Sequence, residues 1–234
     1  MKVAIVTGGS SGMGEATVKE LAKRGWQVAA MARSNAGFQG DVARDQDCRR
    51  VAKAVLDKFG RIDALVNCAG TTKFVAHADL EGLSAEDFEA IFRVNLIGPY
   101  QMIRACLPAL KASKGCIVNV SSVASILGTG SSIAYAASKA ALDTMSFSLA
   151  RALGPEIRVN IVAPGYVRTP WHVAAHGAEG AAQRERQFAE RAPLKAAAEP
   201  QDIADAIAWL IEGARSVTGE IIYVDGGMHI ASPR

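Results

Sequence analysis

The segment that most constrains the fold is a glycine-rich turn, Thr7-Gly8-x-x-x-Gly12-x-Gly14, which directly follows the apolar run Val3–Thr7. Apolar residues at helical spacing follow it, so the turn is predicted to join a strand to a helix. Gly8 would allow the sharp turn, Gly12 a close approach of the backbone to a phosphate, and Gly14 tight packing of helix on sheet. The residues expected around that phosphate are Gly8, Ser10, Ser11, Gly12, Met13 and Gly14. A glycine turn that binds no ligand is the alternative.

Short apolar runs rich in β-branched residues alternate with longer helical patterns along all 234 residues. This alternation is typical of a parallel sheet with helices on both faces. The predicted strands are Val3–Thr7, Gln27–Ala32, Phe38–Asp41, Ala64–Cys68, Cys116–Ser121, Arg158–Ala163 and Glu220–Val224. We therefore expect an α/β protein with a single Rossmann-fold domain over residues 1–234, built on a doubly wound, seven-stranded parallel sheet.

Helix boundaries are indicated by capping residues. The helical pattern Glu15–Arg24 stops at Gly25, which favours a left-handed cap. Ser84-x-x-Asp87 resembles a capping box that begins a long helix through Leu110, and Ile203–Ile211 follows Pro200. The alanine-rich, charged segment 170–193 has the length of a substrate lid, and an ordinary solvated helical insertion explains it equally well.

Composition limits the functional class. The net charge is +3, and the basic residues are scattered among acids and alanines, which argues against a nucleic-acid partner. The four cysteines show no C-x-x-C spacing, so we expect reduced thiols. No apolar stretch approaches the roughly 18 residues of a membrane span. These features predict a soluble, cytoplasmic protein without a membrane partner.

Tyr135 and Lys139 are spaced four residues apart, so in a helix they share one face. Tyrosine titrates near ~10, and acid–base work at neutral pH needs a pKa depression of roughly 3 units, or about 4 kcal/mol. A cation ~4 Å away at an effective dielectric of ~20 supplies about that much. By itself the pair is a chance helical spacing in many proteins. Ser122, at the end of a predicted strand, and the glycine turn upstream make a catalytic set the stronger hypothesis.

Asn95 lies inside the long predicted helix, four residues before Pro99. Because proline has no N–H, it cannot bond to the Asn95 carbonyl, and Gly98 beside it adds flexibility. We expect a kink that leaves this carbonyl free in a buried place. The alternative is that Gly98-Pro99 ends one helix and begins another.

The end of the second predicted strand reads Met31-Ala32-Arg33-Ser34 and contains no acid. In dinucleotide sites a carboxylate at this place usually binds the ribose 2′-OH, whereas an arginine can bind a 2′-phosphate. NADP(H) is therefore favoured over NAD(H), with NAD(H) as the alternative.

Together, the chain resembles the short-chain dehydrogenases/reductases over nearly its whole length, and is similar to members such as 3-oxoacyl-acyl-carrier-protein reductases and dihydrodiol dehydrogenases. The motifs occur in the family's order: the glycine turn, Asp41-Val42, Asn67-Cys68-Ala69-Gly70, Asn95, Ser122, Tyr135-x-x-x-Lys139, and Pro164-Gly165 followed by Thr169. The resemblance implies an NAD(P)H-dependent oxidoreductase that interconverts a carbonyl and a secondary alcohol. The sequence departs from the family in two places. Cys68 stands where a second asparagine is usual, and residues 34–40 are expected to form a loop where the family has a helix between the second and third strands.

The resemblance also implies a role for each matched residue. Tyr135 would be the general acid or base, Lys139 would lower its pKa and bind the nicotinamide ribose, and Ser122 would orient the substrate oxygen. The main-chain carbonyl of Asn95 would hold a water linked to the lysine, as part of a proton relay. The remaining cofactor contacts are predicted at Arg33, Asp41, Val42, Asn67, Ala69, Gly70, Pro164, Gly165, Val167 and Thr169.

Three further expectations concern partners. The substrate is predicted to be a small carbonyl or alcohol, with Trp171 and His172 as its contacts beside Ser122 and Tyr135. No metal is expected, because His172 and His176 have no third ligand nearby. A homo-oligomer is expected from the family, as a tetramer or a dimer. A non-catalytic nucleotide-binding sensor or scaffold of the same fold is the alternative, which the presence of all four catalytic residues disfavours.

Overall fold

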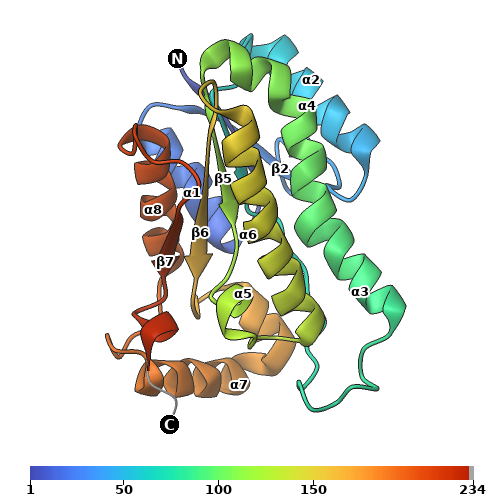
Figure 1. The fold of residues 1–234 in the computed structure, drawn as a ribbon, viewed down its shortest axis with the longest axis vertical. Coiled ribbons are helices and arrows are strands. Elements are labelled where there is room, and N and C mark those ends of the chain that lie inside the picture. The colour runs from blue at the N-terminus through green and yellow to red at the C-terminus, as the bar shows by residue number, and fades with distance from the viewer. Residues whose placement is uncertain (232–234) are drawn as a thin grey trace.

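The computed structural model describes residues 1–231, and its core is one parallel sheet (Figure 1). Within these residues the sheet has seven strands in the order β3-β2-β1-β4-β5-β6-β7, all parallel. The order reverses between β1 and β4, which makes the sheet doubly wound and confirms the predicted fold class. The strands are β1 Val3–Thr7, β2 Gln27–Ala32, β3 Phe38–Gln39, β4 Ala64–Asn67, β5 Cys116–Val120, β6 Arg158–Pro164 and β7 Ile221–Val224.

Both faces of the sheet are buried. In β1, Val3 and Ile5 pack into the core formed with helices α2 (Asp45–Phe59), α4 (Gly98–Ser113) and α6 (Ile133–Leu153). Ala4 and Val6 point to the other face, where α1 (Gly12–Lys23) and α8 (Pro200–Glu212) lie. Since successive side chains of a strand alternate between faces, a strand covered on both sides is expected to be apolar on both faces, as β1 is from Val3 to Val6.

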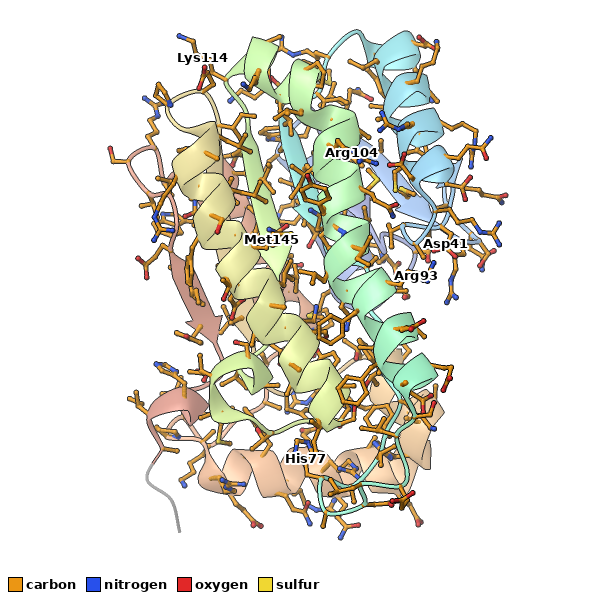
Figure 2. The ribbon with its side chains drawn as sticks, turned by 45° about the vertical axis from the view of Figure 1, so that its right-hand side comes forward. Asp41, His77, Arg93, Arg104, Lys114 and Met145 are labelled. Atoms are coloured by element: carbon orange, nitrogen blue, oxygen red, sulfur yellow. The ribbon has the colours of Figure 1, made fainter. Side chains whose placement is uncertain are left out.

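On the α2 side, α4 and α6 run side by side (Figures 1 and 2), and Met145 of α6 lies on the surface between them, whereas Arg104 of α4 pairs with Asp45 of α2. A groove of about 670 Å³ follows the line between the two helices. Its lining is mostly apolar and consists of Leu96, Ile97, Tyr100, Ala140, Ala141, Thr144, Met145 and Ser148.

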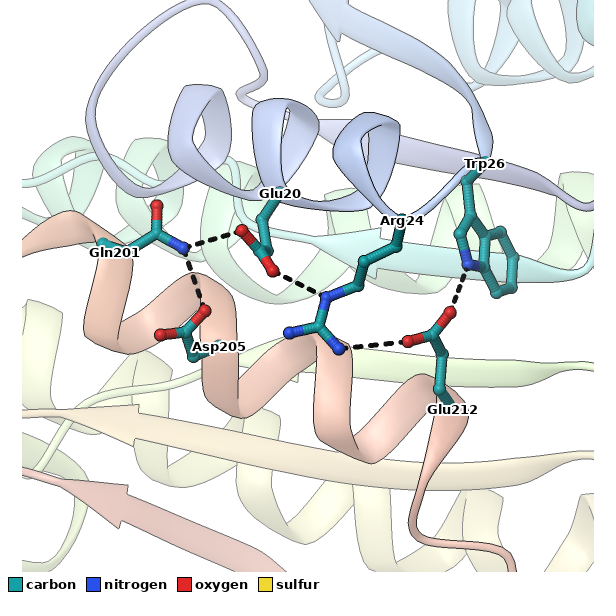
Figure 3. Close-up of polar contacts among 6 residues, drawn as sticks. All are labelled: Glu20, Arg24, Trp26, Gln201, Asp205 and Glu212. Atoms are coloured by element: carbon teal, nitrogen blue, oxygen red, sulfur yellow. Dashed lines mark hydrogen bonds and ion pairs between the residues drawn. The ribbon is translucent and has the colours of Figure 1, made fainter.

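On the opposite side, α1 and α8 are joined by a polar network (Figure 3). Arg24 donates to Glu20 at 2.6 Å and to Glu212 at 3.1 Å, and Glu212 also accepts from the Trp26 indole at 2.8 Å. Gln201 of α8 donates to the second oxygen of Glu20 at 3.0 Å. Hydrogen bonding to Arg24 is the main cause that lowers the pKa of Glu20. The network ties the helix that follows the glycine turn to the last helix of the fold.

The predicted long helix after Ser84 is helical throughout but not uniform. Ser84 and Asp87 form the expected capping box, with bonds of 3.3 and 2.9 Å. Helix α3 (Ala85–Phe92) then passes through a π-helical turn, Arg93–Ile97, into α4. In that turn the Gly98 N–H donates to the Arg93 carbonyl, five residues back. Pro99 lies in the first turn of α4, where its missing N–H costs no helical hydrogen bond. A π-helical turn thus stands where a kink was expected, and a new α-helical segment begins at Gly98, as the alternative predicted.

Several predicted boundaries shift. Strand β3 ends at Gln39 rather than Asp41, because the Asp41 N–H is taken by the Asp47 side chain at 3.0 Å. Helix α1 begins at Gly12, three residues before the predicted start. No separate helix was predicted at α2 or at the short helix α5 (Ala124–Leu127), which follows β5.

The segment predicted as a lid or an insertion is helix α7, Pro170–Arg191, which crosses the lower end of the molecule in Figure 1. Gly177 interrupts it with φ 68° and ψ 172°, so the helix has two halves. The second half is held by Tyr166, whose hydroxyl donates to the Ala181 carbonyl at 2.9 Å, and by Arg168, which pairs with Glu185 at 2.7 Å.

Candidate functional site

A cleft of about 290 Å³ opens at the carboxyl ends of β1, β2 and β4, the expected place for a ligand in a doubly wound sheet. Thr7 pairs with Asn67 and Asn67 with Asn119, so the turns after β1, β4 and β5 leave the sheet side by side. The cleft is lined by Gly8, Ser10–Gly14, Met31–Ser34, Gly40–Val42, Cys68–Thr71, Val94 and Thr169–Trp171. The predicted residues of the glycine turn all lie on its wall.

The glycines of this turn are required by close contacts of the backbone. A Cβ on Gly14 would lie 2.2 Å from the Gly8 carbonyl oxygen, and one on Gly8 would lie 3.0 Å from the Ala69 backbone. Gly8 and Gly12 also have positive φ, at 68° and 53°. A Cβ on Gly12 would approach the Thr169 methyl at 3.3 Å. The turn therefore keeps a bare backbone at the N-terminus of α1, where free N–H groups and the helix dipole favour a phosphate.

Thr7 connects this turn to the next strand. Its side chain is 1% exposed, and its hydroxyl oxygen accepts from the N–H groups of Cys68 and Ala69, both at 3.1 Å. The Thr7 hydroxyl and the N–H groups of Cys68 and Ala69 thus pair with one another at the ends of β1 and β4, without water. The predicted cleft residues Ala69 and Gly70 are held on the wall by this arrangement.

At the far end of the cleft, Arg33 and Ser34 follow β2 and are exposed. Within residues 1–231, Arg33 forms no hydrogen bond or ion pair. Asp41 lines the wall, but its Oδ1 accepts from the Ala43 N–H at 2.9 Å, and Val42 beside it is 7% exposed.

Four residues predicted by resemblance as cofactor contacts lie outside this wall. Asn67 is 2% exposed and points into the sheet layer, where it donates to Asn119 at 2.8 Å. Gly165 packs against Phe188 and Asp225, so a Cβ there would lie 2.6 Å from the Phe188 ring. Val167 is buried and bridges to Ala198, and the Pro164 carbonyl accepts from Val123 at 2.9 Å. In the structure these residues support the cleft from behind.

A buried chain of hydrogen bonds continues from Asn67, and no motif in the sequence predicted it. Asn119 of β5 donates to Ser146 at 2.8 Å, and Ser146 donates to the Leu142 carbonyl at 2.7 Å. Asn119 and Ser146 are fully buried. The chain fixes α6 relative to the two central strands, since each buried polar group is costly to leave unpaired.

Asn95 sits in the π-helical turn with its side chain fully buried. Its amide donates to the Thr71 carbonyl and to the Ser138 hydroxyl, both at 3.0 Å, and its Oδ1 accepts from the Thr71 N–H at 2.8 Å. Ser138 in turn donates to the Tyr135 carbonyl at 2.7 Å. The side chain of Asn95, and not only its main-chain carbonyl, therefore links the cleft wall to α6. Ser138 stands inside the Tyr-x-x-x-Lys motif, which was a signal that could have been used.

Tyr135 and Lys139 share one face of α6, as the spacing predicted. Ser132 begins the helix by accepting from the Tyr135 N–H at 3.3 Å. The Lys139 Nζ lies 5.8 Å from the centroid of the Tyr135 ring and donates to the Val120 carbonyl at 2.8 Å. A Cβ on Gly70 would be 3.8 Å from that Nζ and 3.6 Å from Asn95 Oδ1. Lys139 and Asn95 therefore approach the cleft at Gly70, which lies on its wall.

The expected depression of the Tyr135 pKa is not found in the protein alone. Burial raises the pKa of Tyr135 to about 12, and a hydrogen bond with Ser122 opposes the rise. Burial lowers the pKa of Lys139 to about 8. The four-residue spacing predicted an ammonium ~4 Å from the phenol at an effective dielectric of ~20. In the folded protein, desolvation of the phenolate is the largest effect on the pKa of Tyr135.

The predicted substrate contacts lie beside this centre. Trp171 lines the cleft and packs edge-on against Tyr135, with ring centroids 6.2 Å apart. His172 stacks on Tyr166 at 4.1 Å, and burial lowers its pKa to about 4. His176 packs against Phe74 at 4.5 Å. Of these contacts, the one from Trp171 places the start of α7 against Tyr135.

The described residues lack the features of two other classes of protein. Residues 1–231 contain no cluster of three or more His, Cys, Asp or Glu side chains suited to a metal ion. Across the same residues, no helix combines the length and the apolar character that crossing a bilayer requires. The four cysteines are free thiols, three of them buried.

The chain is similar to known proteins over nearly its whole length. A family model described as enoyl-(acyl carrier protein) reductase matches residues 8–229. A 3-oxoacyl-[acyl-carrier-protein] reductase from Thermotoga maritima is 37% identical, covering 98% of this chain and 98% of that protein. L-fucose dehydrogenase from Mus musculus is 32% identical, covering 100% and 90%.

Two solved structures have the same fold. A Burkholderia xenovorans protein described as a short-chain dehydrogenase/reductase has a TM-score of 0.89 at 39% identity, with 99% of each chain covered. Ligand-free aldohexose dehydrogenase from Thermoplasma acidophilum has a TM-score of 0.93 at 29% identity, covering 100% of this chain and 96% of that one. Nearly the whole chain is thus shared with relatives.

Proposed function

The chain belongs to the short-chain dehydrogenases/reductases, which are NAD(P)-dependent oxidoreductases, and on this premise we propose that it reduces a small carbonyl compound with NADPH, using Tyr135 as the proton donor. The observation that carries the proposal is the convergence of the phosphate-binding turn and the Tyr135–Lys139 face on one cleft. Neither feature alone would distinguish an enzyme from a nucleotide-binding protein.

The cofactor would lie along the cleft wall, with its phosphates at the bare backbone of the glycine turn. The donor set fits such a group, because Gly8, Gly12 and Gly14 leave room that a Cβ would fill. Arg33 supports NADP(H) over NAD(H), since an exposed guanidinium without a protein partner can pair with a 2′-phosphate in two parallel hydrogen bonds. Held there, the nicotinamide supplies a hydride to the substrate carbon or takes one from it.

The proton step falls to the chain's own residues. At neutral pH the Tyr135 phenol carries its proton, because its pKa is about 12, and it can donate that proton to a substrate carbonyl oxygen. Ser122 would give the same oxygen a second hydrogen bond. The ammonium of Lys139, on the same helix face, would stabilise the phenolate that forms as the proton leaves.

Asn95 would act by positioning. Its three side-chain hydrogen bonds hold Thr71 of the cleft wall and Ser138 of α6 in a fixed relation. Because misplacement of a reacting group by about 1 Å can cost 10²-fold in rate, such a link matters to the reaction without touching the substrate. The proton relay through its main-chain carbonyl is part of the same proposal.

The substrate side is proposed to consist of Trp171 and His172 on the first half of α7, which would act as the lid. Gly177 divides the half that covers Tyr135 from the half fixed by Tyr166 and Arg168. Relatives named for 3-oxoacyl-[acyl-carrier-protein], L-fucose and aldohexose support the carbonyl and alcohol class rather than one compound.

A homo-oligomer is proposed from the groove between α4 and α6 (Figure 2). Ile97 and Tyr100 are each 47% exposed on this groove, and an apolar strip of that kind fits a second copy of the same helices. Sedimentation velocity should give a dimer or tetramer, and a monomer at micromolar concentration would reject the assembly.

The proposed function is tested by the loss of NADPH or NADH absorbance in the presence of the protein. The candidate substrates are a panel of ketones, aldehydes, sugars and acyl thioesters. Wild-type protein should reduce at least one class, and Tyr135→Phe should lose most of the turnover, by roughly 10² to 10⁴-fold. NADPH binding, measured by protein fluorescence, should stay within about twofold in that variant. Binding of NADPH without turnover of any panel member would favour the sensor or scaffold instead.

A further inference from the structure

Asp143 lies one helical turn beyond Lys139 on α6 and continues the face of Tyr135 and Lys139. Asp143 and Lys139 are each 5% exposed. A carboxyl group removed from water is costly unless it is paired. Its Oδ1 has no hydrogen-bond partner within residues 1–231.

The surroundings of Asp143 come from three other elements. The hydroxyls of Ser121, at the end of β5, and Ser125, on α5, lie beside its carboxyl, although the Ser125 hydroxyl finds no well-formed hydrogen bond in the described chain. From β7, Tyr223 faces it as the remaining titratable neighbour. Burial raises the pKa of Asp143, and the charge of Lys139 is among the effects that oppose the rise.

The groups around Lys139 differ in charge at neutral pH. Burial is the main effect on the lysine and lowers its pKa to about 8, while Cys68 and then Asp143 oppose this. Burial raises the pKa of the Cys68 thiol to about 11 and that of Tyr135 to about 12, so both are uncharged near pH 7. Of the three side chains Cys68, Tyr135 and Asp143, the carboxyl of Asp143 is the one whose type titrates in the acid range when exposed to water, and burial raises its pKa from there.

We propose that Asp143 is a positioning residue for the reaction: its buried carboxylate, one turn behind Lys139, keeps that lysine in the charged form that the proton step uses. It acts through Lys139 and touches neither substrate nor cofactor. The inference rests on the proposed function, because it assigns a task to the ammonium of Lys139.

The sign of the effect follows from the charges. A carboxylate stabilises the ammonium, so its removal lowers the pKa of Lys139 further below about 8. As the pH is raised, activity that depends on the charged lysine would then begin to decline at a lower pH than in the wild type. Two opposite charges inside a protein interact by about 1.4 kcal/mol or more, which corresponds to about one pKa unit. We therefore expect the pKa of Lys139 to fall by about one unit.

The test compares Asp143→Asn, which keeps the shape and removes the charge, with Asp143→Glu, which keeps the charge. In the pH dependence of kcat/KM for carbonyl reduction, the alkaline limb of Asp143→Asn should move down by about one pH unit. Asp143→Glu should restore it toward the wild-type position. Ser146→Ala is the matched control, because Ser146 is a buried polar residue on the same helix that bonds to Asn119 and Leu142 instead. An unmoved limb in Asp143→Asn would overturn the proposal.

A second readout does not depend on turnover. The ¹³Cε resonance of Lys139, identified by its loss in Lys139→Met, can be titrated in the protein without substrate. Its midpoint should fall by about one pH unit in Asp143→Asn and stay unchanged in Ser146→Ala. If Asp143→Asn does not fold, the wild-type resonance should still show a second, acid inflection as Asp143 takes up its proton, and a single inflection would overturn the proposal. Full turnover by Lys139→Met would reject the proposed function, whereas these titrations still decide the coupling.

Discussion

The cofactor cleft and the catalytic face of α6 lie at the same edge of the sheet but are built from different parts of the chain. The cleft is shaped by backbone: Gly14 must approach the Gly8 carbonyl, and Thr7 holds two N–H groups of the opposite wall. The catalytic face is shaped by buried side chains, and burial moves the pKa of Tyr135 upward and that of Lys139 downward. Backbone geometry is thus robust to pH, whereas the catalytic face carries the protonation states on which the chemistry depends.

The largest effect is expected where the comparison places the chemistry. Lys139→Met keeps an unbranched side chain of similar volume and removes the charge. Turnover should fall by roughly 10³-fold, because the phenolate formed at Tyr135 loses its stabilising cation. The measurement is kcat for carbonyl reduction at saturating NADPH, with a thermal melt to show that the fold persists. A loss below about tenfold, with a normal melt, would remove the lysine from the proton step.

The next effect should appear in binding. Gly14→Ala would put a Cβ 2.2 Å from the Gly8 carbonyl oxygen, so the glycine turn must move. Overpacking of this kind costs about 1–3 kcal/mol, and we expect NADPH affinity to fall by about tenfold or more. Gly37→Ala is the control, since its Cβ would meet nothing within 4 Å. Unchanged NADPH affinity in Gly14→Ala, measured by fluorescence titration, would contradict the role of the bare backbone.

A smaller and more selective effect is expected at Arg33. Arg33→Ala should raise the KM for NADPH about tenfold, which corresponds to roughly 1.4 kcal/mol, and change the KM for NADH by less than about twofold. Its exposed side chain has no partner in the described chain, so stability should stay within about 0.5 kcal/mol. Arg49→Ala, which removes an exposed arginine paired with Asp45, should leave both KM values unchanged. Equal effects on the two cofactors would reject Arg33 as the 2′-phosphate contact.

The smallest effect should come from the network between α1 and α8 (Figure 3). Glu212→Gln weakens its bonds to Arg24 and Trp26, both at a partly exposed site. Such pairs contribute about 0–1 kcal/mol, so Tm should fall by no more than about 4 °C, with KM and kcat unchanged. A change in KM for NADPH would show that the far side of α1 is coupled to the cleft.

Much of the backbone-built region could be predicted from the sequence. The glycine spacing, the apolar strands and the capping box at Ser84 each follow from local rules, and each is found in place. The spacing of Tyr135 and Lys139 likewise predicted a shared helix face. The cofactor contacts at Asn67 and Gly165 stay predictions, because motif order does not reveal that their nearest partners are Asn119 and the Phe188 ring.

The side-chain-built region was harder to predict, for a physical reason. Whether Lys139 depresses the pKa of Tyr135 depends on distance and burial together, and neither can be read from a four-residue spacing. The links from Asn95 to Thr71 and Ser138 join segments far apart in the chain. Pro99 predicted an irregularity near Asn95 in the long helix, but it did not predict that the irregularity is the π-helical turn Arg93–Ile97.

The pH profile of carbonyl reduction tests the central claim most directly. The reaction needs a protonated Tyr135, which holds its proton up to a pKa of about 12, and a charged Lys139, which loses its proton near a pKa of about 8. With NADPH saturating, kcat should be level below that pH and decline above it, with a midpoint within about one unit of 8, and Lys139→Met should lack this limb. A profile that rises through pH 8, or one that Lys139→Met leaves unaltered, would contradict a catalytic face governed by a buried, charged lysine.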